Sequence, residues 1–142
     1  SNNFILVFMK VIFFNNYGEK TIAGVKNVSE KLLENLVGEK HKIIYCSELD
    51  ILVDNIFKFK PNVIFLHCHN SFRSFDNVCI LSKHIREKLT KCGIIVTFRN
   101  DEFGDHNDYI AKYLSDFEAD LFLPMGPDFI KEVNKILDSF EI

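Results

Sequence analysis

Residues 62–74, NVIFLHCHNSFRS, pass from a continuous apolar run straight into two histidines around a cysteine and then into a polar loop. The apolar run, 62–67, is short and does not alternate with polar residues, which is typical of a β-strand covered on both faces. In an open α/β sheet, ligands bind just beyond the carboxyl ends of the strands. The fold around this strand therefore decides whether its polar end is a binding site.

The rest of the chain alternates such apolar runs with helical periodicity. Further strands are predicted at 9–14, 41–46, 93–98 and 119–124. Apolar residues recur at helical spacing within 25–36, 49–56, 78–89, 110–117 and 130–137. Strict alternation of strand and helix implies right-handed crossovers and a parallel sheet with helices on both faces. The sequence thus predicts a three-layer α/β fold with a parallel five-stranded sheet, Rossmann-like or flavodoxin-like.

Two charged or polar stretches are interpreted within this framework. Residues 47–50, SELD, have the pattern of a capping box at the start of a helix. Residues 83–91, KHIREKLTK, are interpreted as the solvated face of another helix. Both stretches are thus assigned a structural role and not a place in a binding site.

The length and charge of the chain limit its class. The chain has 142 residues and a formal net charge of −3, with basic residues scattered among acidic ones. This length suits one domain with its own core, so we predict a single α/β domain over 1–142, with 1–8 as a tag or linker, excised from a longer chain. The charge pattern offers no general attraction to phosphate backbones, which excludes nucleic acid as the main partner.

The apolar opening and the cysteines bear on location. Residues 3–16, NFILVFMKVIFFNN, are interrupted by Lys10, are too short to span a bilayer and lack a signal cleavage site, so we predict no transmembrane segment. The four cysteines show neither CxxC spacing nor the density of a disulfide scaffold. This usage suits a reducing compartment, and the sequence predicts a cytoplasmic protein.

The predicted sheet brings the polar ends of its strands to one edge, where a ligand would bind. The candidate binding residues lie in or near the loops after the first, third and fourth strands: Asn16, Tyr17, Gly18, Gly24, His69, Asn70, Ser71, Arg73, Arg99, Asn100 and Asp101. Position alone does not name the ligand, because this fold hosts many chemistries.

A metal site at His67, Cys68 and His69 is disfavoured. Neighbours in an extended segment point to opposite faces, so only the two histidines converge, and two ligands are too few for zinc. The acidic loop 101–108, DEFGDHND, is more simply a helix N-cap with its capping partner. We predict no metal; histidines that only end a buried strand remain an open alternative.

Catalytic and phosphate-binding motifs are also missing. A nucleophilic Cys68 has no evident acid to orient a histidine, and the other three cysteines are interpreted as buried reduced thiols. The loop 15–27, NNYGEKTIAGVKN, lacks both GxGxxG and GxxxxGK[ST], which disfavours a dinucleotide or P-loop site. Gly18 and Gly24 serve either the approach of a phosphate or a turn and a tight helix start. The catalytic residues stay unknown.

Several short motifs, taken in order, resemble the N-terminal domain of retaining glycosyltransferases built from two Rossmann-like domains, the B-type fold. The matching landmarks are AGV at 23–25, HKI at 41–43, KPNVI at 60–64, HNS at 69–71, VTFRND at 96–101 and ADL at 119–121. The resemblance covers most of residues 9–137. This chain departs from the family pattern at two positions. Ala23 replaces one glycine of the family's Gly-Gly pair, and Arg99 replaces the family's histidine.

The resemblance implies the acceptor-side half of a glycosyltransferase, inactive in isolation. In this family a C-terminal domain holds the nucleotide-sugar donor, so we expect that donor in a partner domain, no cofactor in this one, and a sugar or lipid-linked acceptor. His69 and Asn70 would bind a sugar hydroxyl or a phosphate, and Arg73 an anionic acceptor group. Enzyme activity is expected only together with the second domain.

The alternative is a resemblance to response-regulator receivers. The alternating units, a strand-four threonine at Thr97 and the Ala-Asp strand are similar to that family. Receivers need an acidic pair after strand one, a phospho-accepting Asp after strand three and a Lys after strand five. This chain has Asn15 and Asn16, His67 and Met125 there. The resemblance therefore implies a degenerate receiver that acts by protein contact without phosphorylation.

Overall fold

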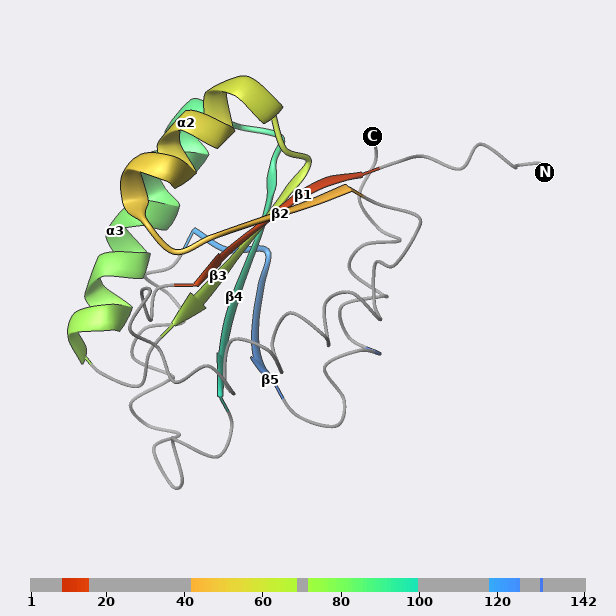
Figure 1. Ribbon diagram of the computed structural model, residues 1–142. Helices are drawn as coiled ribbons and strands as arrows, with labels where there is room; N and C mark the ends of the chain where they lie inside the picture. The colour runs from red at the N-terminus through yellow and green to blue at the C-terminus, as the bar shows by residue number, and fades with distance from the viewer. Residues whose placement is uncertain (1–8, 16–41, 69–71, 100–117, 126–130, 132–142) are drawn as a thin grey trace.

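The computed structural model describes residues 9–15, 42–68, 72–99, 118–125 and 131. These residues form five strands and two helices, shown in Figure 1: β1 (Lys10–Asn15), β2 (Lys42–Cys46), α2 (Leu49–Phe59), β3 (Val63–Cys68), α3 (Phe72–Lys88), β4 (Gly93–Arg99) and β5 (Leu121–Met125). Each strand lies within about two residues of its predicted range, as expected for boundaries read from hydrophobic patterns.

All the strands form one parallel sheet in the order β2-β1-β3-β4-β5. This is the flavodoxin-like order, in which the direction of winding reverses between β1 and β3. The predicted α/β fold with a parallel five-stranded sheet is confirmed, and the strand order selects the flavodoxin-like alternative over the Rossmann-like one.

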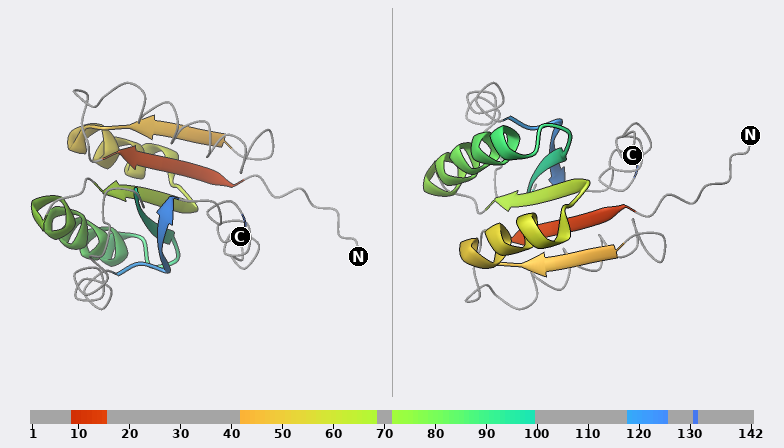
Figure 2. Two further views of the ribbon diagram at one scale, coloured as in Figure 1. Left: turned by 90° about the horizontal axis from the view of Figure 1, so that it is seen from below. Right: turned by 90° about the horizontal axis from the view of Figure 1, so that it is seen from above.

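Both faces of the sheet are buried at the central strands β1, β3 and β4, which explains why these strands are continuous apolar runs. Helices α2 and α3 cover the face that carries Ile12 and Ile64, with Leu52 and Val78 packed against it. Figure 2 shows the two helices side by side over this face. On the opposite face the side chains are also fully buried: Val11, Phe13, Val63, Phe65 and Ile95.

The start of α3 and the cap of α2 differ from prediction. Helix α3 begins at Phe72, six residues before the predicted stripe, because its first turns carry polar residues that break the apolar pattern. The predicted capping box is wrong, since the N-cap of α2 is Glu48 and makes no side-chain capping bond. Instead, Asp50 Oδ1 accepts a hydrogen bond from the backbone N–H of Ile51 at 3.0 Å.

The interpretation of residues 83–91 as a solvated face is wrong for one side chain. Arg86 Nη1 donates to the carbonyl oxygens of Cys92 at 2.6 Å and Thr90 at 3.2 Å. Its Nη2 donates to Asp120 Oδ2 at 3.0 Å, and the same oxygen accepts from the backbone N–H of Ile94 at 2.8 Å. Arg86 therefore joins the end of α3 to the starts of β4 and β5.

Lys60, the residue after α2, lies in the left-handed region at φ 53° and ψ 67° and is the only non-glycine residue with positive φ among those that the structure describes. A side chain in this region costs about 1–2 kcal/mol, and glycine avoids most of that cost but loses more entropy on folding. We expect Lys60→Gly to raise the free energy of unfolding by about 0.5–1 kcal/mol. Urea unfolding followed by circular dichroism would measure the change.

The matched control is Lys58→Gly, two residues earlier in the last helical turn of α2. There glycine has no conformational advantage and should cost about 1 kcal/mol. If both variants were destabilised equally, the left-handed cap at Lys60 would be refuted.

Candidate functional site at the carboxyl edge of the sheet

Three polar side chains lie buried in a row across the middle of the sheet, near the carboxyl ends of its strands. Asn15 pairs in register with His67, and His67 pairs with Thr97. All three residues are buried, His67 and Thr97 completely. We call Asn15, His67 and Thr97 the strand-end row. It spans β1, β3 and β4, and so includes the β1/β3 switch point where this type of sheet binds ligands.

The His67 ring is held from two sides. Its Nδ1 lies 2.8 Å from Thr97 Oγ1 in a buried hydrogen bond. Its ring stacks on that of Phe13, with the ring centroids 5.8 Å apart and the planes inclined by 29°. These contacts fix the ring inside the core, and His67 still belongs to β3, as predicted for a histidine at a strand end.

Cys68 is not placed for nucleophilic chemistry. Its side chain points to the other face of β3 and packs in the core beneath α2 and α3. Burial raises the pKa of its thiol well above the usual value, whereas reactive cysteines need a lowered pKa. This geometry agrees with the sequence, which offered no evident acid to orient a histidine beside this thiol.

All four cysteines are free. Burial raises the pKa of Cys92 to about 12 and that of Cys46 to about 11. Cys79 and Cys92 are buried as predicted, but Cys46 is only partly buried because it lies on the edge strand β2. At neutral pH, therefore, the thiols of Cys46 and Cys92 are protonated and unreactive.

Most of the predicted binding residues lie outside the described part of the chain, so their role stays a prediction. Those are Asn16, Tyr17, Gly18, Gly24, His69, Asn70, Ser71, Asn100 and Asp101. Arg73 falls in the first turn of α3, and Arg99 ends β4, in register with Met125 of β5.

The binding-residue prediction omitted the strand-end row itself. Asn15 and His67 were recognisable as polar residues at the ends of apolar runs, and Thr97 as a polar residue near the end of another. Their side chains could not be placed together from local pattern alone, since the residues are up to 82 positions apart. The register of the sheet brings them into one row.

The described residues form neither a metal-binding cluster nor a membrane-spanning helix. Among these residues no group of three or more His, Cys, Asp or Glu side chains is arranged to hold a metal ion. The helices that the structure describes include none long and apolar enough to cross a membrane.

Comparison with solved structures finds receiver domains. The receiver domain of the response regulator RcsB from Salmonella enterica serovar Typhimurium superposes with a TM-score of 0.67 at 16% identity, covering 96% of this chain and 93% of that one. The response regulator TrrA from Thermotoga maritima, solved with Mg²⁺ and BeF, superposes with a TM-score of 0.64 at 16% identity, covering 92% of this chain and 98% of that one. A receiver domain from Vibrio parahaemolyticus superposes with a TM-score of 0.60 at 13% identity, covering 93% of this chain and 88% of that one. Neither the known protein-family models nor the curated protein sequences gave a match.

These likenesses correct the main interpretation of the sequence. The prediction of the acceptor-side domain of a glycosyltransferase is wrong, because the similar structures are receivers along nearly the whole length of the chain. The assignment of the chain as part of a transferase is wrong for the same reason, and a sugar or lipid-linked acceptor has no support. What these likenesses establish is the receiver fold, at identities too low to carry a function with it.

Proposed function

We propose that this chain is a receiver-like signalling domain that acts through protein contact without aspartyl phosphorylation. The proposal draws on the receiver fold and on the residues at the strand ends. Asn15, His67 and Met125 stand where receivers carry an acid, the phospho-accepting Asp and the Lys, while Thr97 keeps the threonine of strand four.

The observation that carries the proposal is the state of His67. An acyl phosphate needs a carboxylate at the end of β3, and this position holds an imidazole that is 0% exposed and hydrogen-bonded to Thr97. The neighbouring Asn15 offers an amide, which cannot supply the negative charge that draws Mg²⁺ to a carboxylate site. The strand-end row thus works as a packed part of the core.

The proposed partner is another protein in the cytoplasm. A net charge of −3 with scattered basic residues gives little attraction to nucleic acid. Four free cysteines suit a reducing compartment. A domain without its own chemistry would convey a signal by the surface that it presents.

We expect no saturable binding of beryllofluoride in the presence of Mg²⁺ and no labelling by acetyl phosphate. The physical reason is the missing carboxylates, because both reagents need a carboxylate oxygen and a metal held by acids. Isothermal titration calorimetry and ¹H–¹⁵N correlation spectra during the titration would measure binding. The TrrA receiver, solved with Mg²⁺ and BeF, provides the positive control. Saturable Mg²⁺-dependent binding that disappears on mutating a single Asp would refute the proposal.

A further inference from the structure

Two lysines stand side by side where β1 and β2 begin. Lys10 and Lys42 are partners in the register of these parallel strands. Their ammonium groups lie 5.8 Å and 5.5 Å from the centre of the ring of Phe59, the last residue of α2. The ring attracts both cations, but like charges at directly paired positions of neighbouring strands repel each other. An anion bound beside the pair would relieve this repulsion.

Three more lysines continue this row along the amino edge of the sheet, the edge from which the strand arrows in Figure 1 start. Lys60 follows α2 and stands two residues before Asn62, whose Oδ1 accepts a hydrogen bond from the Lys10 N–H at 2.8 Å. Lys88 ends α3, and Lys91 lies in the turn between α3 and β4. All five side chains are exposed. We call this set the amino-edge lysines: Lys10, Lys42, Lys60, Lys88 and Lys91.

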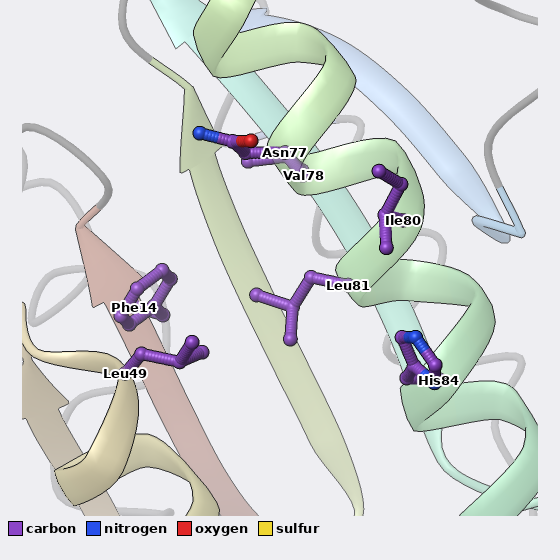
Figure 3. Close-up of a pocket in the computed structure, with 7 residues that line it drawn as sticks. All are labelled: Phe14, Leu49, Asn77, Val78, Ile80, Leu81 and His84. Carbon is purple, nitrogen blue, oxygen red and sulfur yellow. The ribbon is translucent and has the colours of Figure 1, made fainter.

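A pocket lies within this row, and it differs in character from the pocket between the helices. The pocket between α2 and α3, about 370 Å³ in volume, is lined mainly by apolar side chains such as Leu49 and Leu81 (Figure 3). The pocket at the amino edge has a volume of about 310 Å³, and Lys88, Lys91 and Asn62 are among the residues that line it. A negatively charged group at the amino edge would therefore meet two ammonium groups in one hollow.

The acidic side chains in the described ranges do not neutralise this row. Glu48, Asp50 and Asp76 lie near the starts of the helices, at the carboxyl edge. Glu118 precedes β5, at the far end of the sheet from β2. The other three already have a basic neighbour: Asp54 with Lys58, Asp120 with Arg86 and Glu87 with His84. Within the described residues no amino-edge lysine takes part in an ion pair, so the row is a patch of excess positive charge.

The spacing of the row suits an extended acidic segment. Neighbouring strands are about 4.8 Å apart, and the side chains on one side of an extended chain are about 6.6 Å apart. A lysine ammonium on its flexible stem reaches a carboxylate over such a difference without a fixed geometry. Successive carboxylates of a partner would therefore each meet an ammonium group along this edge.

Two features favour the carboxylates of a protein over the phosphates of a nucleic acid. Among the described arginines only Arg86 lies at this edge, and its guanidinium is engaged with Asp120 and two carbonyl oxygens. The row as described thus lacks the forked contact that arginine makes with phosphate. The Phe59 ring faces two ammonium groups and so does not serve as a stacking platform for a base.

We infer that the amino-edge lysines bind an acidic segment of a partner protein, which lies along the starts of β2, β1 and β3 and the end of α3. Carboxylates of the segment pair with the lysines, and binding relieves the repulsion between Lys10 and Lys42. The inference rests on the proposed function, because it names a surface and a kind of partner for the protein contact proposed above.

Fluorescence anisotropy with an octaglutamate peptide labelled with fluorescein tests the site at about 50 mM salt, where screening is weak. The wild-type chain should bind the peptide saturably. Lys42→Glu should raise the dissociation constant about tenfold, because an attractive contact is lost and a repulsive one is added. Lys91→Glu, at the other end of the row, should weaken binding to a similar degree, and circular dichroism would check that both variants fold.

The matched control is Lys83→Glu, which makes the same change of charge at an exposed position of α3. Lys83 lies five residues before Lys88 and so on a different side of the helix. This variant should raise the dissociation constant for octaglutamate less than about twofold.

Competition with inorganic polyphosphate and with duplex DNA identifies the class of anion. At equal concentration of charge, both should displace the labelled peptide less effectively than unlabelled octaglutamate does. Displacement by either phosphate polymer that is as strong or stronger, no saturable binding to the wild type, or an equal loss for Lys83→Glu and Lys42→Glu would each overturn the inference. None of these outcomes bears on the absence of phosphorylation, which the beryllofluoride titration tests separately.

Discussion

His67→Ala is expected to lower the free energy of unfolding by about 3–4 kcal/mol. The ring is completely buried, stacks on Phe13 and bonds to Thr97. Truncation would leave a cavity the size of the ring and a buried threonine hydroxyl without this partner. Urea unfolding, fitted with a common slope, would measure the loss.

Two further substitutions divide this effect into its parts. Thr97→Val keeps the shape but removes the hydroxyl and should cost about 1–2 kcal/mol. His67→Phe keeps the stacked ring but not the hydrogen bond, and should lie between Thr97→Val and His67→Ala. The control is His84→Ala, which removes a histidine exposed on α3 and should change stability by less than about 0.5 kcal/mol. A small effect of His67→Ala, equal to that of His84→Ala, would show that the ring is not held in the core.

The fold was predictable because its central strands β1, β3 and β4 are buried on both faces. Neighbours such as Ile12 and Phe13 point to opposite faces and are both almost fully buried. A strand of this kind needs apolar residues at consecutive positions, and the local sequence shows that run directly. The strand order was not predictable in this way. Whether the chain after β2 crosses to one side of β1 or the other depends on packing between distant segments, and no local pattern records it.

The candidate site was predictable only in part for the same reason. His67 could be placed at the end of a strand, but its contacts come from Phe13 and Thr97 on two other strands. Local sequence cannot distinguish a polar residue that turns into the core from one that turns toward a ligand. That distinction required the register of the sheet.

Two of the motifs behind the glycosyltransferase resemblance serve strand pairing. Asn62, from the Lys-Pro-Asn landmark, accepts from the backbone N–H of Lys10 with Oδ1 and donates its own N–H to the Lys10 carbonyl, each at 2.8 Å. Asp120, from the Ala-Asp landmark, makes the same pair of bonds with Ile94, also at 2.8 Å. A polar residue that pins the start of one strand to its neighbour is useful in any parallel sheet. Such motifs therefore report shared architecture and not shared function.

The second large effect is expected at the opposite edge of the sheet from the strand-end row. Arg86→Ala should cost about 2–3 kcal/mol, because three hydrogen bonds from one guanidinium are lost and the Cys92 carbonyl loses its charged donor. Arg86→Lys should recover less than half of this loss, since an ammonium cannot reproduce the forked geometry. Asp120→Ala should cost about 2 kcal/mol, because the Ile94 N–H also loses its side-chain acceptor.

The double variant Arg86→Ala with Asp120→Ala isolates the ion pair between them. The two side chains are 25% and 38% exposed, so solvent weakens their attraction, and we expect a coupling energy of only about 1 kcal/mol. The rest of the Arg86 effect comes from the carbonyl bonds, which persist without Asp120. The control is Lys58→Ala, whose pair with Asp54 on α2 is 74% and 57% exposed and should contribute about 0.3–0.5 kcal/mol. If Arg86→Ala lowered the free energy of unfolding no more than Lys58→Ala, Arg86 would be a solvated surface charge. Removing a residue that joins α3 to β4 and β5 should cause a larger loss of stability.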